Sequence, residues 1–465
     1  MSDSSQIIVT SKTLTEIHAV PIEEDGFVFY APLRRTAWIG NDAARRVIER
    51  LRRGERWRFT WRDNKLVEFL DRLGLFRDTP DQEPLSPPVS PWQPTRLTLL
   101  LTTNCTLRCR YCYASAGDRL TNDMTIETAV RGIDWIAGNA VAIGASMIKI
   151  FLHGGGEPTA NWPVLVGATT QARRRAAEHG LQSQITLATN AVLDTAKVDW
   201  IVANLDGMTV SFDGLPVVHD RNRRLANGAP SSGYVLKTLR RLDEREFSYG
   251  IRSTVTADAI ASLPDSIEFI YKNCRPTMVQ VEPVYQFGRG EGAESAETEE
   301  FIHAYRAAQQ RARELGGNLA MSPVRIGALT DHFCEATKGS FCLTTSGNVT
   351  SCYEVFAEDL PWASHFFFAR LNQRGGYEID EDVLNKLQEQ SVHKRRYCRD
   401  CFARWDCAGD CYHKALMANG EGEIKGTGRC RIIRELSKDM LLDRIAACGG
   451  IVWQDGAVIS LSSGE

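Results

Sequence analysis

The feature that most limits the possible folds of this chain is a regular alternation between residues 96 and 285. Six short apolar runs alternate there with segments of helical spacing. The runs are 96–103, 147–152, 184–189, 207–212, 248–255 and 278–285, and the helical segments are 126–139, 163–179, 233–246 and 264–273. This alternation predicts a parallel sheet of strand–helix units, and six units predict an α/β fold with a partial (β/α)6 barrel of the TIM type. In such sheets the functional groups gather at the carboxyl ends of the strands.

The segments on either side of the barrel have different patterns. Residues 1–80 combine a strand-like run at 27–30 with two amphipathic helical stretches, which predicts a small α+β unit. Residues 81–95 are rich in proline and predict a semi-rigid linker to a barrel spanning 96–325. Residues 326–465 contain nine of the thirteen cysteines, and we expect metal rather than long amphipathic helices to organise this last domain.

Composition excludes several classes of partner. The formal net charge is only -3 and the isoelectric point is about 6.4, so the chain has no overall basic field that would attract nucleic acid or an anionic membrane. No run approaches the roughly 20 apolar residues that cross a bilayer. We therefore expect a cytoplasmic protein, in which thirteen cysteines would bind metal rather than form structural disulfides.

Three cysteines form a CxxxCxxC motif directly after the first predicted strand. They are Cys105, Cys109 and Cys112. A cubane iron–sulfur cluster takes four cysteines when fully ligated, so three thiolates would leave one iron open to a ligand. A zinc site or three buried thiols remain the alternatives for the triplet alone.

Other strand ends carry small and polar residues. The second strand ends in the glycine-rich sequence HGGGEP, the third in Thr189-Asn190, and the fourth in Ser211-Phe-Asp213-Gly214. Glycines allow a ligand to approach the backbone, and a carboxylate can accept a hydrogen bond from an ammonium group. Taken alone, Asn190 and Asp213 are also ordinary turn residues.

Together these motifs resemble the radical S-adenosylmethionine (radical SAM) superfamily. The resemblance implies that the three cysteines hold a [4Fe–4S] cluster whose open iron binds SAM, and that SAM is cleaved to a 5′-deoxyadenosyl radical. It further implies a SAM pocket formed by Gly155, Gly156, Glu157, Thr189, Asn190, Ser211 and Asp213.

The later cysteines resemble the SPASM extension of radical SAM enzymes. The resemblance implies two auxiliary [4Fe–4S] clusters, an outer one on Cys398, Cys401, Cys407 and Cys430, and an inner one on Cys334, Cys352 and Cys411. Cys342 is the natural fourth inner ligand, although an inner cluster with an open iron is the alternative. Two structural zinc sites would be the alternative for the whole array. Cys274 and Cys448 match no ligand position.

The N-terminal unit resembles the PqqD-like recognition element, a winged-helix-like domain that binds precursor peptides by strand addition. A structural cap or dimerisation module is the alternative. The full resemblance implies an oxidoreductase that modifies a ribosomally made peptide, forming a C–C, C–O or thioether crosslink or, alternatively, epimerising a residue. A flavodoxin- or ferredoxin-type partner would supply single electrons.

Two other functions fit parts of the pattern. A sulfatase maturase, which generates formylglycine, shares the barrel and the cysteine array but has an aspartate after the inner-cluster cysteine. Here Tyr353 and Glu354 follow Cys352. A non-catalytic iron–sulfur electron carrier or peptide-binding scaffold would not need the SAM pocket.

Overall fold

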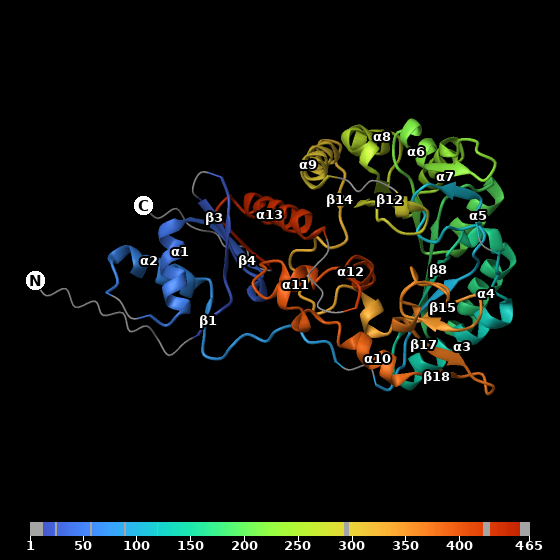
Figure 1. Cartoon of the computed structure of the whole chain (residues 1–465), viewed down its shortest axis with the longest axis horizontal. Helices are drawn as coiled ribbons and strands as arrows, with labels where there is room; N and C mark the ends of the chain where they lie inside the picture. Colours follow the sequence, from blue (N-terminus) through green and yellow to red (C-terminus); the bar gives the residue numbers. More distant parts are fainter. Residues whose placement is uncertain are drawn as a thin grey trace, which may run out of the picture.

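The computed structural model describes residues 13–23, 26–55, 58–87, 90–118, 120–292, 297–421 and 428–455. The outermost parts of the expected first and last domains, 1–12 and 456–465, lie outside the described residues. Figure 1 shows an elongated arrangement, with a small N-terminal unit at one end and a large sheet wrapped by helices at the other.

A sheet of eleven strands forms the centre of the described structure, in the order β14-β13-β12-β10-β9-β8-β6-β15-β16-β17-β18. Every pairing from β14 to β15 is parallel. The parallel strands that precede β15 are β6 (Arg96–Leu100), β8 (Met147–His153), β9 (Gln182–Thr189), β10 (Gly207–Ser211), β12 (Tyr249–Val255), β13 (Val279–Pro283) and β14 (Leu319–Ala320). All six predicted strands are present, and the predicted partial barrel of α/β class is confirmed.

Helices follow the strands and cover the sheet. They are α3 (Ile126–Ala142), α4 (Trp162–Glu178), α5 (Thr195–Asn204), α6 (Pro216–Asn222), α7 (Ser232–Glu244), α8 (Leu263–Asn273) and α9 (Thr298–Glu314). Side chains of Thr125 and Asp194 cap α3 and α5 by accepting from backbone amides, as expected at helix starts. The four predicted helices are confirmed, whereas α5, α6 and α9 were not predicted.

The cysteine-rich region extends the barrel sheet. β15 (Cys342–Leu343) runs parallel to β6, and β16 (Val349–Thr350), β17 (Phe367–Leu371) and β18 (Tyr377–Ile379) continue the sheet with antiparallel pairings. The helices here are α10 (Glu381–Gln388), α11 (Arg404–Cys407), α12 (Tyr412–Asn419) and α13 (Cys430–Ala447). The expectation that this region has no long amphipathic helix was wrong, because α13 buries a regularly spaced apolar face over 18 residues.

The N-terminal unit is an antiparallel sheet between two layers of helix. Its strand order is β19-β4-β3-β2, formed by β2 (His18–Pro21), β3 (Gly26–Ala31), β4 (Thr36–Asn41) and β19 (Val452–Gln454) from the far end of the chain. One face, including Phe29 and Trp38, packs on α1 (Asp42–Arg52) and α2 (Trp61–Arg72). The other face, including Val28 and Tyr30, packs on α13 and the segment 402–407. A separate two-stranded sheet joins β1 (Thr13–Leu14) to β5 (Phe76–Arg77).

The proline-rich segment contacts the C-terminal region rather than lying free. Trp92 is buried among Phe341, Phe368 and Tyr377, and its indole nitrogen donates to the Gly339 carbonyl at 2.8 Å. The backbone amide of Ser86 donates to Asp331 at 2.8 Å. These contacts hold the segment against the domain that follows it.

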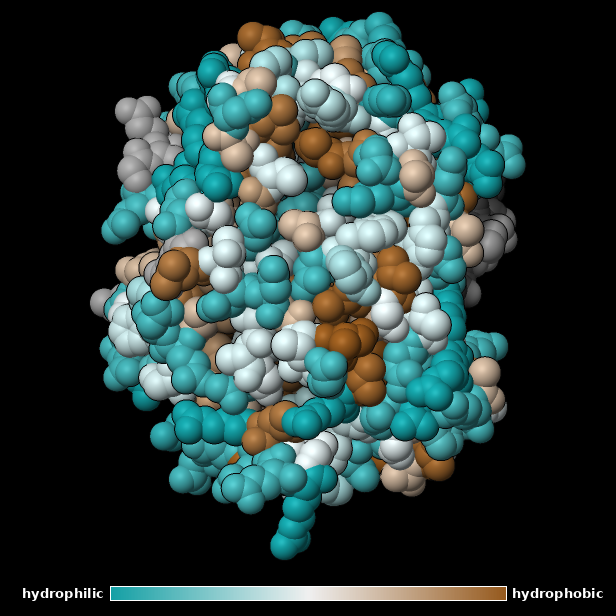
Figure 2. Space-filling view, turned by 90° about the vertical axis from the view of Figure 1, so that its right-hand side faces the viewer, coloured by the Kyte–Doolittle hydropathy of each residue, from teal (hydrophilic) through white to brown (hydrophobic). Residues whose placement is uncertain are grey.

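Among the described residues, no helix combines the length and the apolar character needed to cross a bilayer. The barrel face that points away from the N-terminal unit is mostly hydrophilic, with hydrophobic residues in small patches (Figure 2).

Substitution of Trp453 tests how much the stability of the N-terminal sheet depends on β19. This buried residue of β19 pairs with Ala37 of β4 and packs among the residues between the sheet and α13. We expect Trp453→Ala to cost about 3–5 kcal/mol locally, because it leaves a large cavity. Hydrogen exchange of β4 amides should then be about a hundredfold faster or more. Ile451→Ala is the matched control, since Ile451 precedes β19 and its side chain is 54% exposed; equal exchange in the two variants would contradict the prediction.

Candidate functional site

The CxxxCxxC segment lies at the carboxyl end of β6, as the sequence predicted. β7 (Leu107–Cys109) pairs with β11 (Arg223–Leu225), and this pairing fixes the middle of the segment. The pKa of Cys105 is raised to about 12, mainly by burial and also by the nearby Glu157, Cys109 and Cys112. Burial also raises the pKa of Cys109 to about 11. The three thiols lie together, and the raised pKa values of Cys105 and Cys109 mean that these two favour the thiolate form only beside positive charge such as a metal cluster.

The glycine-rich sequence after β8 packs directly on the cysteine segment. The amide of Gly156 donates to the Thr102 carbonyl at 2.9 Å, and the amide of Glu157 donates to the Asn104 carbonyl at 2.7 Å. A Cβ atom on Gly156 would lie 2.0 Å from the Asn104 oxygen, so only glycine fits there. A Cβ atom on Gly155 would lie 2.9 Å from the Phe356 ring. These glycines therefore allow two backbone segments to approach each other as well as a ligand.

Glu157 connects the ends of β8 and β9. Its buried carboxylate accepts hydrogen bonds from the Thr189 hydroxyl at 2.7 Å, the Asn190 amide at 2.7 Å and the Thr159 hydroxyl at 2.8 Å. Burial raises the pKa of Glu157 above its usual range although these donors lower it. Because the carboxylate already accepts from the chain's own groups, it is less available to a ligand than the resemblance implies.

Asn190 contacts the first cysteine. Its side-chain amide donates to the Thr106 hydroxyl at 3.0 Å and lies 3.7 Å from the Cys105 sulfur. A donor at a ligand sulfur tunes a metal centre by drawing electron density from the thiolate. The structure thus places Asn190 beside the cysteine segment, where the sequence predicted a pocket residue.

Asp213 is a buried acceptor for groups around the cysteine segment. It accepts from the hydroxyl of Tyr111 at 2.5 Å, from Arg223 at 3.2 Å and from the backbone amide of Thr254 at 3.2 Å. Its carboxylate therefore positions protein groups. Ser211 is different, because its hydroxyl has no hydrogen-bond partner within the described ranges and the residue is half-buried at the end of β10.

Two arginines beside the cysteines were not predicted. The guanidinium of Arg223 lies 4.0 Å from the Cys109 sulfur, and Arg289 donates to the Cys109 carbonyl at 2.7 Å. Both lower the pKa of Cys109, against the effect of burial. Arg223 ends the sequence His-Asp-Arg-Asn-Arg that follows the SxDG motif, which was the available signal. No sequence pattern near Arg289 indicated this contact, because the residue lies 180 positions from Cys109 along the chain.

The later cysteines form two groups of thiols. The pKa of Cys407 is raised by burial, by Asp410 and by the thiols of Cys398, Cys430 and Cys401. These four outer thiols therefore lie close together. The pKa of Cys352 is raised by burial, by Glu354 and by the thiols of Cys411 and Cys334. These three inner thiols therefore also lie close together.

Cys342 lies at the edge of the inner group. Cys334 is the one thiol among the causes that raise the pKa of Cys342, and burial is the largest cause. The Cys342 sulfur lies 3.8 Å from the Ser340 hydroxyl. Cys274 is buried near Asp243 and Arg240, away from all three groups of thiols.

A buried network of charged groups adjoins the inner thiols. Cys352, Glu354 and His413 place their ligand atoms within 4.8 Å of one another. Glu354 accepts from His413 at 3.1 Å and pairs with Lys414 at 3.8 Å. Burial would raise the pKa of Glu354, but Lys414 and His413 hold it at about 2.

Arg252 of β12 lies close to this network of charged groups. Burial lowers its pKa, and the nearby Tyr353, Glu282 and Glu354 more than offset this effect. Its guanidinium has no hydrogen bond or ion pair with any described side chain. Arg252 lies beside Ser211 in the parallel ladder, so two uncommitted polar side chains adjoin at the mouth of the barrel.

Comparison with known proteins identifies the central part of the chain. Residues 99–263 match the model of the Radical SAM superfamily. Over these residues the chain is similar to radical SAM domains. Such a domain implies an enzyme that uses a [4Fe–4S] cluster and SAM, and the cysteine segment, the HGGGEP sequence and the ends of β9 and β10 all lie within the matched range.

Similar solved structures cover more of this chain than the match to the superfamily does. An uncharacterized protein of Methanocaldococcus jannaschii is 29% identical over 175 residues, which cover 37% of this chain and 57% of that protein. The chain thus matches little more than half of that relative. The structure of anSMEcpe with bound AdoMet has a TM-score of 0.59 at 14% identity, covering 75% of this chain and 98% of that chain. Native anSMEcpe with bound AdoMet and Kp18Cys peptide has a TM-score of 0.59 at 16% identity, covering 76% and 97%. At these identities the likeness shows a shared fold.

Gly156 tests the contact between the glycine-rich sequence and the cysteine segment. We expect Gly156→Ala to displace the Asn104 backbone and to lower iron by about four atoms per chain, because only the first group of thiols is disturbed. Gly138→Ala on α3 is the control, since a Cβ atom there meets nothing within 4 Å. Iron analysis after anaerobic reconstitution makes the measurement, and full iron in Gly156→Ala would contradict the argument.

Proposed function

We propose that this protein is a radical SAM peptide maturase that crosslinks side chains in a ribosomally made precursor peptide. The observation that carries the proposal is the arrangement of the thiols. A group of three lies in the radical SAM domain, and two further groups lie in the cysteine-rich region that extends the same sheet. Three groups suit one SAM-binding cluster and two auxiliary clusters of the SPASM type.

The donor sets fit these groups. Cys105, Cys109 and Cys112 would hold the SAM-binding cluster, Cys398, Cys401, Cys407 and Cys430 the outer cluster, and Cys334, Cys352, Cys411 and Cys342 the inner one. When bound, SAM and the clusters would supply the 5′-deoxyadenosyl radical and take up the electron that a crosslink releases. An external flavodoxin or ferredoxin would supply the electron that starts each turnover.

The residues of the SAM pocket take different roles in this proposal. The carbonyl oxygens of Gly155 and Gly156 would accept from the amino group of SAM, and the Ser211 hydroxyl would contact its carboxylate, because no described group bonds to these oxygens. Glu157, Thr189, Asn190 and Asp213 hold the cysteine segment and the strand ends in position through the hydrogen bonds described above.

A peptide substrate agrees with two further observations. The N-terminal unit has a sheet whose β2 edge has no neighbour among the described strands, as a PqqD-like recognition element would require. One of the anSMEcpe structures similar to this chain holds the Kp18Cys peptide together with AdoMet, so this fold can accept a peptide in a related protein. We propose that the N-terminal unit binds the leader of the precursor and that the barrel mouth receives its core.

A formylglycine-generating activity of the sulfatase-maturase kind is the second candidate. It is favoured by Glu354, which places a carboxylate beside the inner thiols where that class of enzyme has an aspartate. The sequence Tyr353-Glu354 departs from that pattern, so we rank this activity second.

Removal of the first cysteines tests the radical SAM site. We expect Cys105→Ala, Cys109→Ala and Cys112→Ala each to abolish formation of 5′-deoxyadenosine under reducing conditions, because the SAM-binding cluster would lose a ligand. Cys274→Ala is the control, since Cys274 is buried away from the three groups of thiols. Chromatography of the reaction mixtures measures the product, and retained cleavage in all three variants would refute the assignment.

Mass spectrometry of the peptide product separates the candidate reactions. A crosslink removes two hydrogens and yields no aldehyde, whereas formylglycine reacts with a hydrazide probe and epimerisation leaves the mass unchanged. We expect a loss of two hydrogens together with missing backbone fragments between the joined residues. A hydrazide-reactive product would favour the second candidate instead.

A further inference from the structure

One face of the two-stranded ribbon beside the first group of thiols is rich in arginine. The ribbon pairs β7 with β11, and side chains alternate between its two faces. Cys109 and Arg223 lie opposite each other on the buried face, whereas Arg108 and Arg224 lie opposite each other on the face toward solvent. One layer of backbone therefore separates the outer face of the ribbon from the Cys109 thiol.

Two further exposed arginines adjoin the outer face of the ribbon. Arg110 follows β7, and Arg221 lies near the end of α6, shortly before β11. Both pair with the same carboxylate, that of Asp258, at 3.1 and 3.3 Å. We call Arg108, Arg110, Arg221 and Arg224 the arginine face.

Positive charge exceeds negative charge on the arginine face. Two carboxylates form ion pairs with it, and each is shared by two arginines. The first has the two partners just named, and the second, Asp118, pairs with Arg108 and with Arg289. Arg224 forms no ion pair with any described residue, and its guanidinium lies 3.5 Å from the Gly228 carbonyl oxygen. Five arginines thus share two carboxylates.

The pairing of β7 with β11 places two like charges next to each other. Arg108 and Arg224 are directly opposite in the ladder, where like charges destabilise a pair of strands. Asp118 lies 3.6 Å from Arg108 and offsets part of this repulsion. An anionic partner would offset the rest, so the arginine face suits a protein with an acidic surface.

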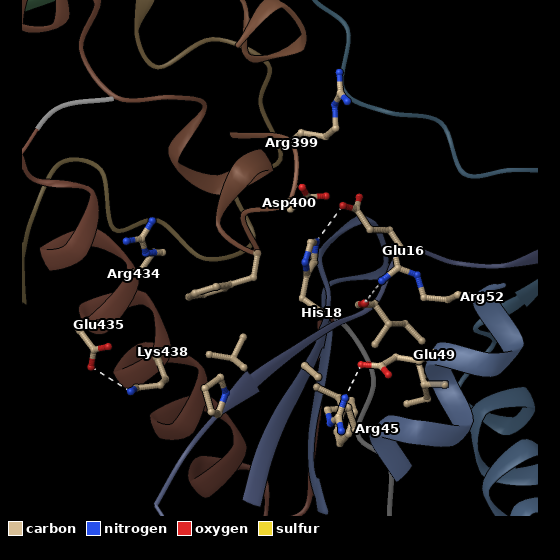
Figure 3. A pocket seen from close by; sticks show the side chains of 17 residues that line it. Glu16, His18, Arg45, Glu49, Arg52, Arg399, Asp400, Arg434, Glu435 and Lys438 are labelled. Atoms are coloured by element: carbon tan, nitrogen blue, oxygen red, sulfur yellow. Dashed lines mark hydrogen bonds and ion pairs between the residues drawn. The ribbon is translucent and has the colours of Figure 1, made fainter. Parts of the chain in front are cut away.

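The surface beside the outer thiols has a different charge balance. A cavity of about 460 Å³ lies there, between the β2 edge of the N-terminal sheet, α1 and α13 (Figure 3). Its charged lining residues are Arg45, Arg52, Arg399, Arg434, Lys438, Glu16, Glu49, Asp400 and Glu435. Three of the acidic side chains pair within the protein, with His18, Arg45 and Lys438. This surface is therefore close to neutral, unlike the arginine face.

We infer that the arginine face docks an acidic one-electron carrier protein, and that the electron reaches the first group of thiols through the ribbon of β7 and β11. The inference rests on the proposed function, because the electron needs a cluster bound by the first cysteines as its acceptor. With a flavodoxin as the carrier, the anionic flavin hydroquinone becomes the neutral semiquinone and the cluster gains one electron, so no proton moves. The position of Cys109 on the opposite side of the ribbon favours this partner over a nucleic acid.

Binding of a purified bacterial flavodoxin in its oxidised state to the reconstituted full chain tests the docking surface. Calorimetry at about 20 mM salt should show binding that weakens as the salt concentration rises. Arg224→Glu and Arg221→Glu should each weaken it about tenfold, whereas Arg224→Lys, which keeps the charge, should not. Arg374→Glu is the matched control, since Arg374 is exposed in the turn between β17 and β18, at the far edge of the central sheet.

The source of electrons separates failure of the inference from failure of the proposed function. Formation of 5′-deoxyadenosine is measured once with flavodoxin and its NADPH-dependent reductase, and once with dithionite, which is small and needs no docking surface. Arg224→Glu should lower the flavodoxin-driven rate about tenfold at limiting flavodoxin and leave the dithionite-driven rate unchanged. If dithionite drives no cleavage in the wild type, the proposed function fails rather than the docking surface.

Four results would overturn the inference. The first is no binding of flavodoxin by the wild-type protein, and the second is unchanged binding in both charge-reversal variants. The third is weaker binding in Arg399→Glu instead, which would place the carrier beside the outer thiols. The fourth is an equal fall of the dithionite-driven rate in Arg224→Glu, because Arg224 would then act on the cysteine segment and not on a partner.

Discussion

The burial of three groups of thiols is the constraint on which the rest of this structure depends. A buried thiolate is costly unless positive charge lies nearby, and burial raises the pKa of Cys109, Cys411 and Cys398, one cysteine from each group. Each group of thiols has its own buried cation. Arg223 lowers the pKa of Cys109, Lys414 lowers that of Cys411, and Arg395 lowers that of Cys398. Lys414 and Arg395 lie three residues from the cysteines on which they act, whereas Arg223 is 114 positions from Cys109, so the first group depends on a long-range contact for its cation.

The C-terminal helix α13 connects the outer thiols to the N-terminal unit. It begins at Cys430, its apolar face packs on the N-terminal sheet, and the chain then returns as β19 to complete that sheet. The Tyr30 hydroxyl also donates to Asp406 at 3.0 Å, one residue before Cys407. The N-terminal unit is therefore attached at both its edge and its face to the segment that carries the outer thiols.

The barrel could be predicted because its signals are local. Apolar runs and helical spacing located every predicted strand and helix of 96–285, and the cysteine and glycine motifs fell at strand ends for the same reason. The missed features depend on partners far away in sequence. β19 has only three residues and is a strand because β4 lies beside it. Arg289 approaches Cys109 across 180 positions, and no spacing rule reports such a contact. The helix α13 did have a visible apolar pattern, which the density of nearby cysteines obscured.

The polar residues of the motifs were predicted from the sequence, and the structure adds the hydrogen bonds that they make. Glu157 and Asp213 are carboxylates at strand ends, where a ligand contact is the simplest expectation. In the structure, both carboxylates accept several hydrogen bonds from the protein. The donors lie on or beside the segments that carry the neighbouring motifs. An acidic group that is buried and fully engaged contributes rigidity, because moving it would leave several donors unsatisfied. Ser211 and Arg252, which are neighbours in register on β10 and β12, have no side-chain hydrogen bond among the described residues. Sequence alone could not separate these two kinds of residue, since the distinction lies in which hydrogen bonds the folded chain has already made.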